Sequence, residues 1–155
     1  MSLFQRIGFS LIACILASVS TALSQTTPER NFVGTWKLVK LNAEKTPGGM
    51  SPCADGCTIS LEGKALVFKT SIWGVDKYLL DGSPVKKTFE LPGYNPIEST
   101  IVIRWDKSTL VIDRQSGERV KSQTRLSVKG EQLVIVTESL GIMPGKSEYI
   151  YARAK

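Results

Sequence analysis

The stretch Arg119–Lys129, with the sequence RVKSQTRLSVK, decides the fold class. The alternate residues from Val120 to Val128 are three apolar residues, one serine and one threonine. The residues between them are basic or polar. Successive side chains of a β-strand point to opposite faces, so this alternation predicts a strand with one covered face and one wet face. The serine and threonine on the covered face leave open whether the interior is solid or contains a cavity.

The same alternation recurs along the chain, interrupted by turns rich in glycine, proline, aspartate and asparagine. Turns spaced about ten residues apart are typical of an all-β sandwich or barrel. A meander of about eight to ten strands must cover its edges, and a closed up-and-down barrel does so most simply. We therefore expect a single antiparallel all-β barrel. Its other predicted strands are Phe32–Lys40, Thr58–Leu61, Ala65–Lys69, Trp73–Leu80, Val85–Leu91, Glu98–Trp105, Thr109–Arg114, Gln132–Ser139 and Ser147–Ala154.

The composition narrows the classes of function. The chain has 155 residues, of which 42% are hydrophobic and 22% charged, as in an ordinary single globular domain. It contains no histidine, which excludes Ser-His-Asp and Cys-His catalysis and histidine-ligated zinc or haem. The net charge is +6, but Lys86-Lys87 is the only adjacent basic pair, so we expect no nucleic-acid partner. We expect a protein that is not an enzyme and holds no metal or cofactor.

The first 24 residues have the pattern of a secretory signal peptide. Arg6 supplies a positive charge, Ile7–Ala22 is an apolar run, and Ala22-Leu23-Ser24 places small residues where signal peptidase cuts. The run is about 16 residues long, shorter than the ~20 that a spanning helix needs. We expect a signal helix over residues 1–24, cleaved to leave an exported protein, periplasmic or extracellular, with no membrane span.

The leader also permits a second reading. Leu11-Ile12-Ala13-Cys14 fits the loose lipoprotein pattern, so anchoring through an acylated Cys14 remains an alternative. The apolar run continues beyond Cys14, which favours free secretion. After the signal we expect an extended N-terminal arm over residues 25–31 and a barrel domain over residues 32–155.

Cys53 and Cys57 form a Cys-x3-Cys pair that includes Gly56. In an exported chain two close cysteines usually form a disulfide, and the glycine helps the chain reverse between them. Two thiols without a histidine fall short of the four ligands of structural zinc, and no Cys-x-x-Cys redox motif is present. We therefore expect a structural Cys53–Cys57 disulfide.

Asn31–Val39, with the sequence NFVGTWKLV, resembles the Gly-x-Trp first strand of the calycins, the superfamily of lipocalins and fatty-acid-binding proteins. The closing segment Tyr149–Arg153 resembles their last strand, which carries a basic residue. The resemblance implies a lipocalin-like barrel whose floor is built by Gly34, Trp36 and Arg153, with the arginine stacked on the tryptophan. The whole chain is similar to small secreted bacterial lipocalin-like proteins.

Two segments depart from the fatty-acid-binding pattern. Leu41–Gly56, where those proteins carry two portal helices, contains prolines and glycines that do not support helices. Tyr151-Ala152-Arg153 reverses the order of their carboxylate-binding Arg-x-Tyr pair. Fatty-acid binding by that mechanism is therefore not expected.

Aromatic side chains on the predicted strands are the candidates for a ligand pocket, although they would serve equally well as core. We expect a secreted or periplasmic protein that binds a small hydrophobic ligand inside the barrel. The alternative is a protein-interaction module, such as a protease inhibitor or an envelope accessory protein, with a packed barrel. The sequence leaves the oligomeric state open. The pocket candidates are Phe68, Trp73, Tyr78, Phe89, Trp105, Tyr149 and Tyr151.

Overall fold

The computed structural model describes residues 27–44, 49–89, 93, 95–118, 120–141 and 144–155. These residues form a short 3-10 helix and a ten-stranded antiparallel sheet, which confirms the predicted all-β class. The predicted signal, residues 1–24, lies outside the described residues. The elements are η1 (Pro28–Phe32), β1 (Gly34–Ala43), β2 (Gly56–Glu62), β3 (Ala65–Thr70), β4 (Gly74–Leu79), β5 (Val85–Phe89), β6 (Ile97–Asp106), β7 (Thr109–Ser116), β8 (Val120–Lys129), β9 (Gln132–Ser139) and β10 (Gly145–Arg153).

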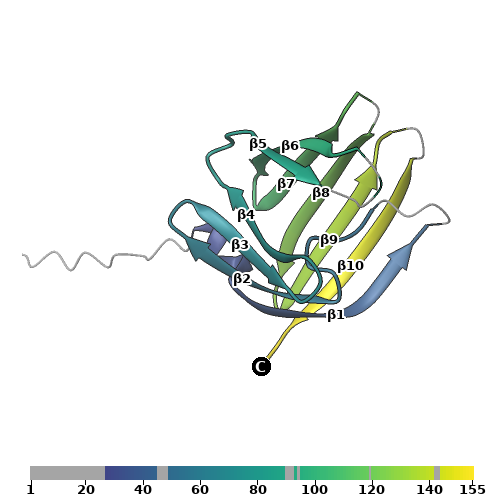
Figure 1. Ribbon diagram of the computed structural model, residues 1–155. Helices are drawn as coiled ribbons and strands as arrows, with labels where there is room; N and C mark the ends of the chain where they lie inside the picture. The colour runs from purple at the N-terminus through teal and green to yellow at the C-terminus, as the bar shows by residue number, and fades with distance from the viewer. Residues whose placement is uncertain (1–26, 45–48, 90–92, 94, 119, 142–143) are drawn as a thin grey trace, which may run out of the picture.

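The sheet curls into a nearly closed up-and-down barrel, as predicted (Figure 1). Its strand order is β4-β3-β2-β1-β10-β9-β8-β7-β6-β5. The first and last strands are neighbours, with Trp36 opposite Arg153 and Leu38 opposite Tyr151. The two ends of the sheet are β4 and β5, whose described residues share no ladder. We call the junction between these two strands the seam.

Two segments differ from the predictions. The described part of the arm expected over residues 25–31 is not extended, because Pro28 begins η1 and the Arg30 amide donates to the Thr27 carbonyl at 3.0 Å. Phe32 ends this helix instead of opening the first strand. Trp73, expected on a strand, lies in the turn between β3 and β4, where its amide donates to Thr70 Oγ1 at 2.8 Å.

The half of the barrel interior nearest η1 is apolar and closely filled, and we call it the floor half. Its largest side chains are at most 1% exposed. Burying one large apolar side chain stabilises a fold by about 1.5–3 kcal/mol, so this half supplies much of the stability. These side chains are Phe32, Trp36, Ile59, Leu66, Phe68, Leu110, Leu126, Leu133, Ile135 and Tyr151.

The opposite half of the interior, the mouth half, is lined largely by hydroxyl groups. Paired residues of neighbouring antiparallel strands share a face. Because Leu126 is buried on the inner face, the register identifies the inward-facing residues of the other strands. Thr124 and Ser122 follow Leu126 on that inner face and are half-buried. Ser122 and Thr124, the two polar residues on the covered face of β8, therefore lie on the inner face but beyond the apolar floor half. Other inward hydroxyls of this half are those of Ser99, Ser116, Thr137, Ser139 and Ser147.

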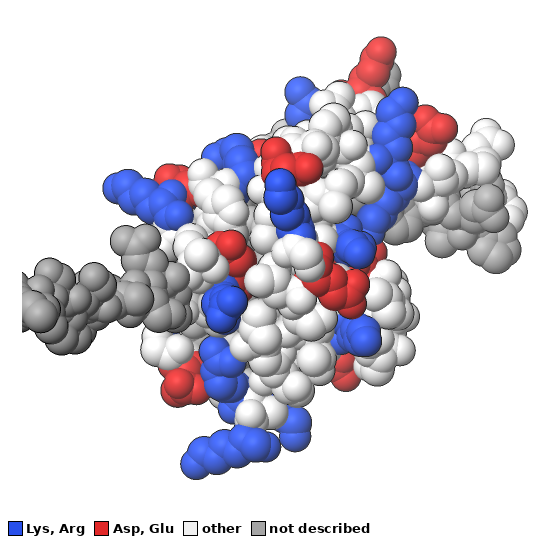
Figure 2. Space-filling model, turned by 90° about the vertical axis from the view of Figure 1, so that its left-hand side faces the viewer, with Lys and Arg blue, Asp and Glu red and all other residues white. Residues whose placement is uncertain are grey.

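Charged side chains of both signs alternate on the outer surface. On the face seen in Figure 2, Lys and Arg lie among Asp and Glu instead of gathering in one basic patch. Exposed pairs of this kind each contribute at most about 1 kcal/mol to stability. They include Lys77–Glu62, Arg104–Asp113, Arg125–Asp106 and Lys146–Glu138.

Candidate functional site

The floor of the barrel is closed by Trp36 and its neighbours. Trp36 is fully buried, and its Nε1 donates to the Phe32 carbonyl at 2.8 Å. The Arg153 guanidinium lies 4.3 Å from the centroid of the Trp36 ring, in a cation–π contact. Its Nη1 and Nη2 donate to the carbonyls of Val33 (2.6 Å) and Asn31 (3.1 Å). A ligand must therefore enter from the mouth half or through the seam.

Four residues, which we call the seam cluster, bring charge into the mouth half: Asp76, Tyr78, Lys87 and Arg114. The register places all of them on the inner face of β4, β5 and β7. Lys87 Nζ forms an ion pair with Asp76 across the seam and lies 5.3 Å from the centroid of the Tyr78 ring. Asp76 and Arg114 both act on the Tyr78 hydroxyl, the first raising its pKa and the second lowering it.

The seam cluster carries more positive than negative charge. Tyr78 is only 2% exposed, and burial, reinforced by the nearby Asp76 carboxylate, raises its pKa well above the usual value of 10. Tyr78 is therefore neutral at physiological pH. Two cations then face one carboxylate. Such an excess of positive charge in a partly buried place attracts an anion.

Residues 49–55, which we call the plug, reach into the mouth half from the side of β9 and β10. The Gly49 carbonyl accepts hydrogen bonds from Thr137 Oγ1 at 3.1 Å and from the Tyr149 hydroxyl at 2.9 Å. The Tyr151 hydroxyl donates to the Ala54 carbonyl at 2.7 Å. The plug consists of irregular chain and a turn, and it contains no helix.

The plug is tied to β2 by the disulfide between Cys53 and Cys57. The Cα atoms of these residues are 4.8 Å apart, and the sulfurs are bonded at 2.04 Å. Cys53 is fully buried and packs in the apolar core. Cys57 lies opposite Trp36 in the sheet, so the bridge anchors the plug beside the barrel floor.

We expect stability to fall above pH 10. Burial raises the pKa of Tyr151 to about 12, and burial and Asp76 raise that of Tyr78, whereas unfolded tyrosines titrate near 10. The stabilisation is complete below pH 10. Above it the unfolded chain loses protons that the folded chain keeps, so the free energy of unfolding falls by about 1.4 kcal/mol per pH unit for each tyrosine.

Urea unfolding between pH 8 and 12 measures this slope. Tyr151→Phe removes one of the two titrating tyrosines. It should therefore lower the slope of the free energy of unfolding against pH by the contribution of Tyr151. A slope that Tyr151→Phe leaves unchanged would contradict the assignment.

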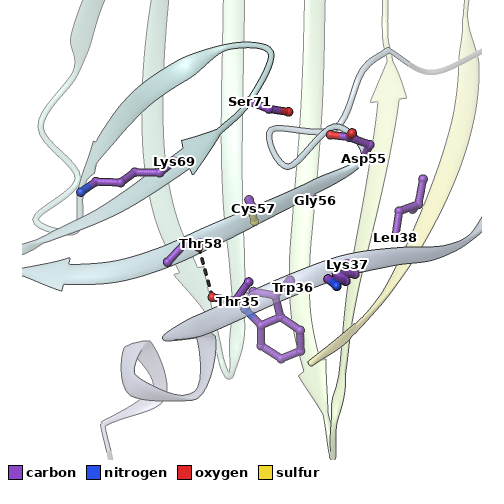
Figure 3. Close-up of a pocket in the computed structure, with 10 residues that line it drawn as sticks. All are labelled: Thr35, Trp36, Lys37, Leu38, Asp55, Gly56, Cys57, Thr58, Lys69 and Ser71. Carbon is purple, nitrogen blue, oxygen red and sulfur yellow. Dashed lines mark hydrogen bonds between the residues drawn. The ribbon is translucent and has the colours of Figure 1, made fainter. Parts of the chain in front are cut away.

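Two open hollows mark the surface of the described residues. One, of about 520 Å³, lies on the outside of β1, β2 and β3 (Figure 3). Gly56 is one of its lining residues, and β1 lies so close to it that a Cβ there would be 2.9 Å from the Trp36 carbonyl oxygen. Thr35 and Thr58 hydrogen-bond one another at 3.1 Å within it, and Lys69 points away. No set of buried polar groups converges in this hollow, so it is not the candidate site.

The second hollow, of about 730 Å³, lies at the mouth of the barrel between the ends of β5, β6 and β7. Ser99 and Ser116, whose hydroxyls hydrogen-bond each other, contribute to its wall. Ile97 and Val120 are exposed beside them and offer apolar contact. Because Ser116 and Arg114 share the inner face of β7, this hollow leads toward the seam cluster. Neither hollow is lined by Tyr78 or Arg114.

The predicted pocket aromatics do not gather around one cavity. Phe68 and Tyr78 pack edge to face, with ring centroids 5.1 Å apart, and Tyr151 is fully buried. Trp105 and Tyr149 are half-buried on the inner face. These residues are mostly core.

Two of the predicted pocket residues do not support a pocket. Trp73 is 47% exposed and outside the barrel interior, which corrects the expectation for this residue. The reason is the turn that Thr70 Oγ1 and the positive φ of Gly74 stabilise before β4. Phe89 lies on β5 opposite Ile97, and its side chain is outside what the structure describes.

The charged members of the seam cluster were not predicted. Asp76 alternates with Tyr78 and Lys87 with Val85, so each stands at an inward position of its strand. Arg114 likewise follows Ile112 on the inner face of β7. A charged residue at an inward position of an otherwise regular strand was the signal that could have found them.

Within the described ranges, no three Cys, Asp or Glu side chains are placed to hold a metal ion. In the same part of the chain, no helix has the length and apolar character needed to cross a membrane.

Comparisons with known proteins identify the fold. No family model and no curated protein matches the sequence. Among solved structures, the barrel is similar to the REP1-NXSQ fatty acid transporter, with TM-score 0.60 and 14% identity over 81% of this chain and 98% of that one. It is also similar to Echinococcus granulosus fatty-acid-binding protein 1, with TM-score 0.56 and 12% identity over 81% and 99%.

A third similar structure is secretory abundant heat soluble protein 4 from Ramazzottius varieornatus, with TM-score 0.57 and 13% identity over 81% of this chain and 96% of that one. At these identities the likeness shows the fold alone. The chain has the same barrel fold as these three structures, in agreement with the barrel that the sequence predicts.

Proposed function

We propose that this chain is an exported lipocalin-like protein that binds a small amphipathic anion inside the mouth half of its barrel. The observation that carries the proposal is the excess positive charge of the seam cluster, above a closed apolar floor. The polar end of the ligand lies at Arg114. Its apolar end packs against the isoleucines of β6 and β7, of which Ile101 is the direct neighbour of Arg114 in the sheet.

Arg114 suits this role because a guanidinium presents several donors in a fixed plane and binds a carboxylate through two hydrogen bonds. The surrounding protein has a lower dielectric constant than water, which strengthens the attraction. Lys87 pairs with Asp76, and the seam cluster as a whole contains one more cation than carboxylates. Two similar structures are named for fatty acids, which are amphipathic anions, and this supports the proposal.

Export is supported by the leader pattern of residues 1–24 and by the disulfide between Cys53 and Cys57. Such bonds persist in oxidising compartments and are rare in the cytosol. The exported protein is either secreted freely or anchored through an acylated Cys14, and the proposal includes both alternatives. The likeness to small secreted bacterial lipocalin-like proteins belongs to it as well.

Three probes with the same eight-carbon tail test the ligand class: octanoate, 1-octanol and octylamine, titrated calorimetrically. We expect octanoate to bind most tightly and octylamine least. Arg114→Gln should weaken octanoate binding about tenfold or more, because a charge-assisted hydrogen bond contributes about 1.5–3 kcal/mol. It should leave 1-octanol binding unchanged.

Arg104→Gln is the matched control, because Arg104 pairs with Asp113 on the outer face, where its side chain is 48% exposed. It should leave octanoate binding unchanged. Equal binding of octanoate and 1-octanol by the unmodified protein would contradict an anion site. If no probe binds, whether the disulfide is formed or reduced, the protein-interaction alternative is favoured, with which the filled floor half agrees.

A further inference from the structure

The plug hydrogen-bonds inward-facing residues of the mouth half. Thr137 and Tyr149 are on the inner face of β9 and β10, and both donate to the Gly49 carbonyl. We propose that the plug is an internal substitute for the ligand, and that the barrel binds an amphipathic anion by displacing it. This inference rests on the proposed function and concerns the regulation of the same site.

Polar contacts, more than apolar packing, hold the plug. Hydroxyl groups donate to its carbonyl oxygens, as they would to the oxygens of a carboxylate. Ser51 Oγ hydrogen-bonds the Tyr151 hydroxyl at 2.7 Å and accepts from the Cys53 amide at 3.1 Å. Each of these bonds contributes little net stability, because water replaces it when the plug leaves. Such a segment can open without unfolding the barrel.

The backbone of the plug is held in uncommon conformations. Ala54 has a φ of +47°, in the left-handed region that non-glycine residues rarely adopt, and Gly49 has a φ of +109°. The Ala54 backbone is strained in this conformation, and the strain is relieved when the segment is released. Met50, next to Gly49, is 70% exposed and adds little packing. The seated state is therefore only modestly favoured.

Cys53 is the plug residue that belongs to the apolar core, and the disulfide fixes it there. Cys57 remains in the sheet opposite Trp36 whether or not the bridge is formed, since the ladder between β1 and β2 holds it. Breaking the bridge frees the plug without opening the barrel. The disulfide thus sets the fraction of molecules whose site is open.

Octanoate affinity measures this fraction, because the apparent dissociation constant equals the intrinsic one divided by the population of the open state. We expect Cys53→Ser/Cys57→Ser to raise octanoate affinity about tenfold. Ser51→Ala removes two plug bonds while keeping the disulfide and should raise the affinity severalfold. Ser127→Ala is the matched control on the outer face of β8 and should change nothing.

Amide hydrogen exchange gives a second readout. The Leu38 amide donates to the Asp55 carbonyl at 3.0 Å, and the Ala54 amide donates to the Ser51 carbonyl at 3.1 Å. We expect saturating octanoate to speed exchange at Leu38 and Ala54, whereas ordinary ligand binding would slow it. This measurement tests the proposal even if the cysteine variant fails to fold.

The outcomes separate the two proposals. If Arg114→Gln weakens octanoate binding but Ser51→Ala and the cysteine variant match the unmodified protein, the anion site stands and the plug inference is overturned. Octanoate binding that slows exchange at Ala54 also overturns it. If no form of the protein binds octanoate, the proposed function itself fails, and the plug has no site to occupy.

Discussion

Replacing Trp36 by alanine should lower the free energy of unfolding by about 3–5 kcal/mol, as removal of a buried aromatic ring does. Trp36 is fully buried, and its indole N–H donates to the Phe32 carbonyl. The alanine leaves a cavity at the floor, an unpaired carbonyl on η1, and Arg153 without the ring on which it stacks. Urea unfolding followed by circular dichroism measures the loss.

Trp73→Ala provides the matched control, since the same substitution is made at a side chain that is 47% exposed. It should cost less than about 1 kcal/mol, the usual range for a surface position. Trp36→Phe should fall between the two and leave octanoate affinity unchanged, because the floor lies away from the mouth half. If Trp36→Ala cost no more than Trp73→Ala, the closed floor would be wrong.

The strands were predictable because alternation and turns are local signals. Arg119–Lys129 gave β8 almost to the residue, and the turns at Gly63, Gly117 and Gly130 have the positive φ that glycine permits. Closure was predicted from the need of a long meander to cover its edges, and the Gly-x-Trp motif with its distant arginine identified the first and last strands as the neighbours. A meander pattern alone is the same for an open and a closed sheet.

The contacts within the seam cluster could not be predicted, because they are not local, although the inward positions of its charged residues could have been. Asp76 and Lys87 are on strands that share no ladder, and only the curvature of the whole sheet brings them together. The sequence also does not reveal where a ten-stranded meander leaves its gap. Trp73 was misplaced for the opposite reason, since a local hydrogen bond to Thr70 holds it in the turn and β4 begins one residue later, at Gly74.

The ion pair of Asp76 and Lys87 protects the unpaired strand edges at the seam. The outer edges of β4 and β5 carry backbone groups with no strand partner among the described residues. Inward-pointing charges on edge strands oppose pairing with another chain, because a new strand would bury them. The same two charges attract each other across the gap and hold it nearly closed. Together with Arg114 they also leave the positive charge on which the proposed ligand site depends.

The second large effect is expected at Gly34. Its φ is +146°, and a Cβ placed there would lie 2.4 Å from Nη1 of Arg153. That nitrogen is fixed by its bond to the Val33 carbonyl, so it cannot move aside without losing the contact. Gly34→Ala should therefore destabilise the protein by about 2–4 kcal/mol, combining backbone strain with a lost charge-assisted hydrogen bond.

A double-mutant cycle separates these two causes. With Arg153→Ala already present, nothing meets the new Cβ, and Gly34→Ala should cost only the strain, at least about 1 kcal/mol less than in the unmodified protein. Gly117→Ala is the control for strain alone, because its φ is +60° and no atom lies within 4 Å of the added carbon. Equal costs of Gly34→Ala in both backgrounds would show that Arg153 does not lie against Gly34. The glycine of the Gly-x-Trp motif would then be required by the backbone only, and the distant arginine would have no part in its selection.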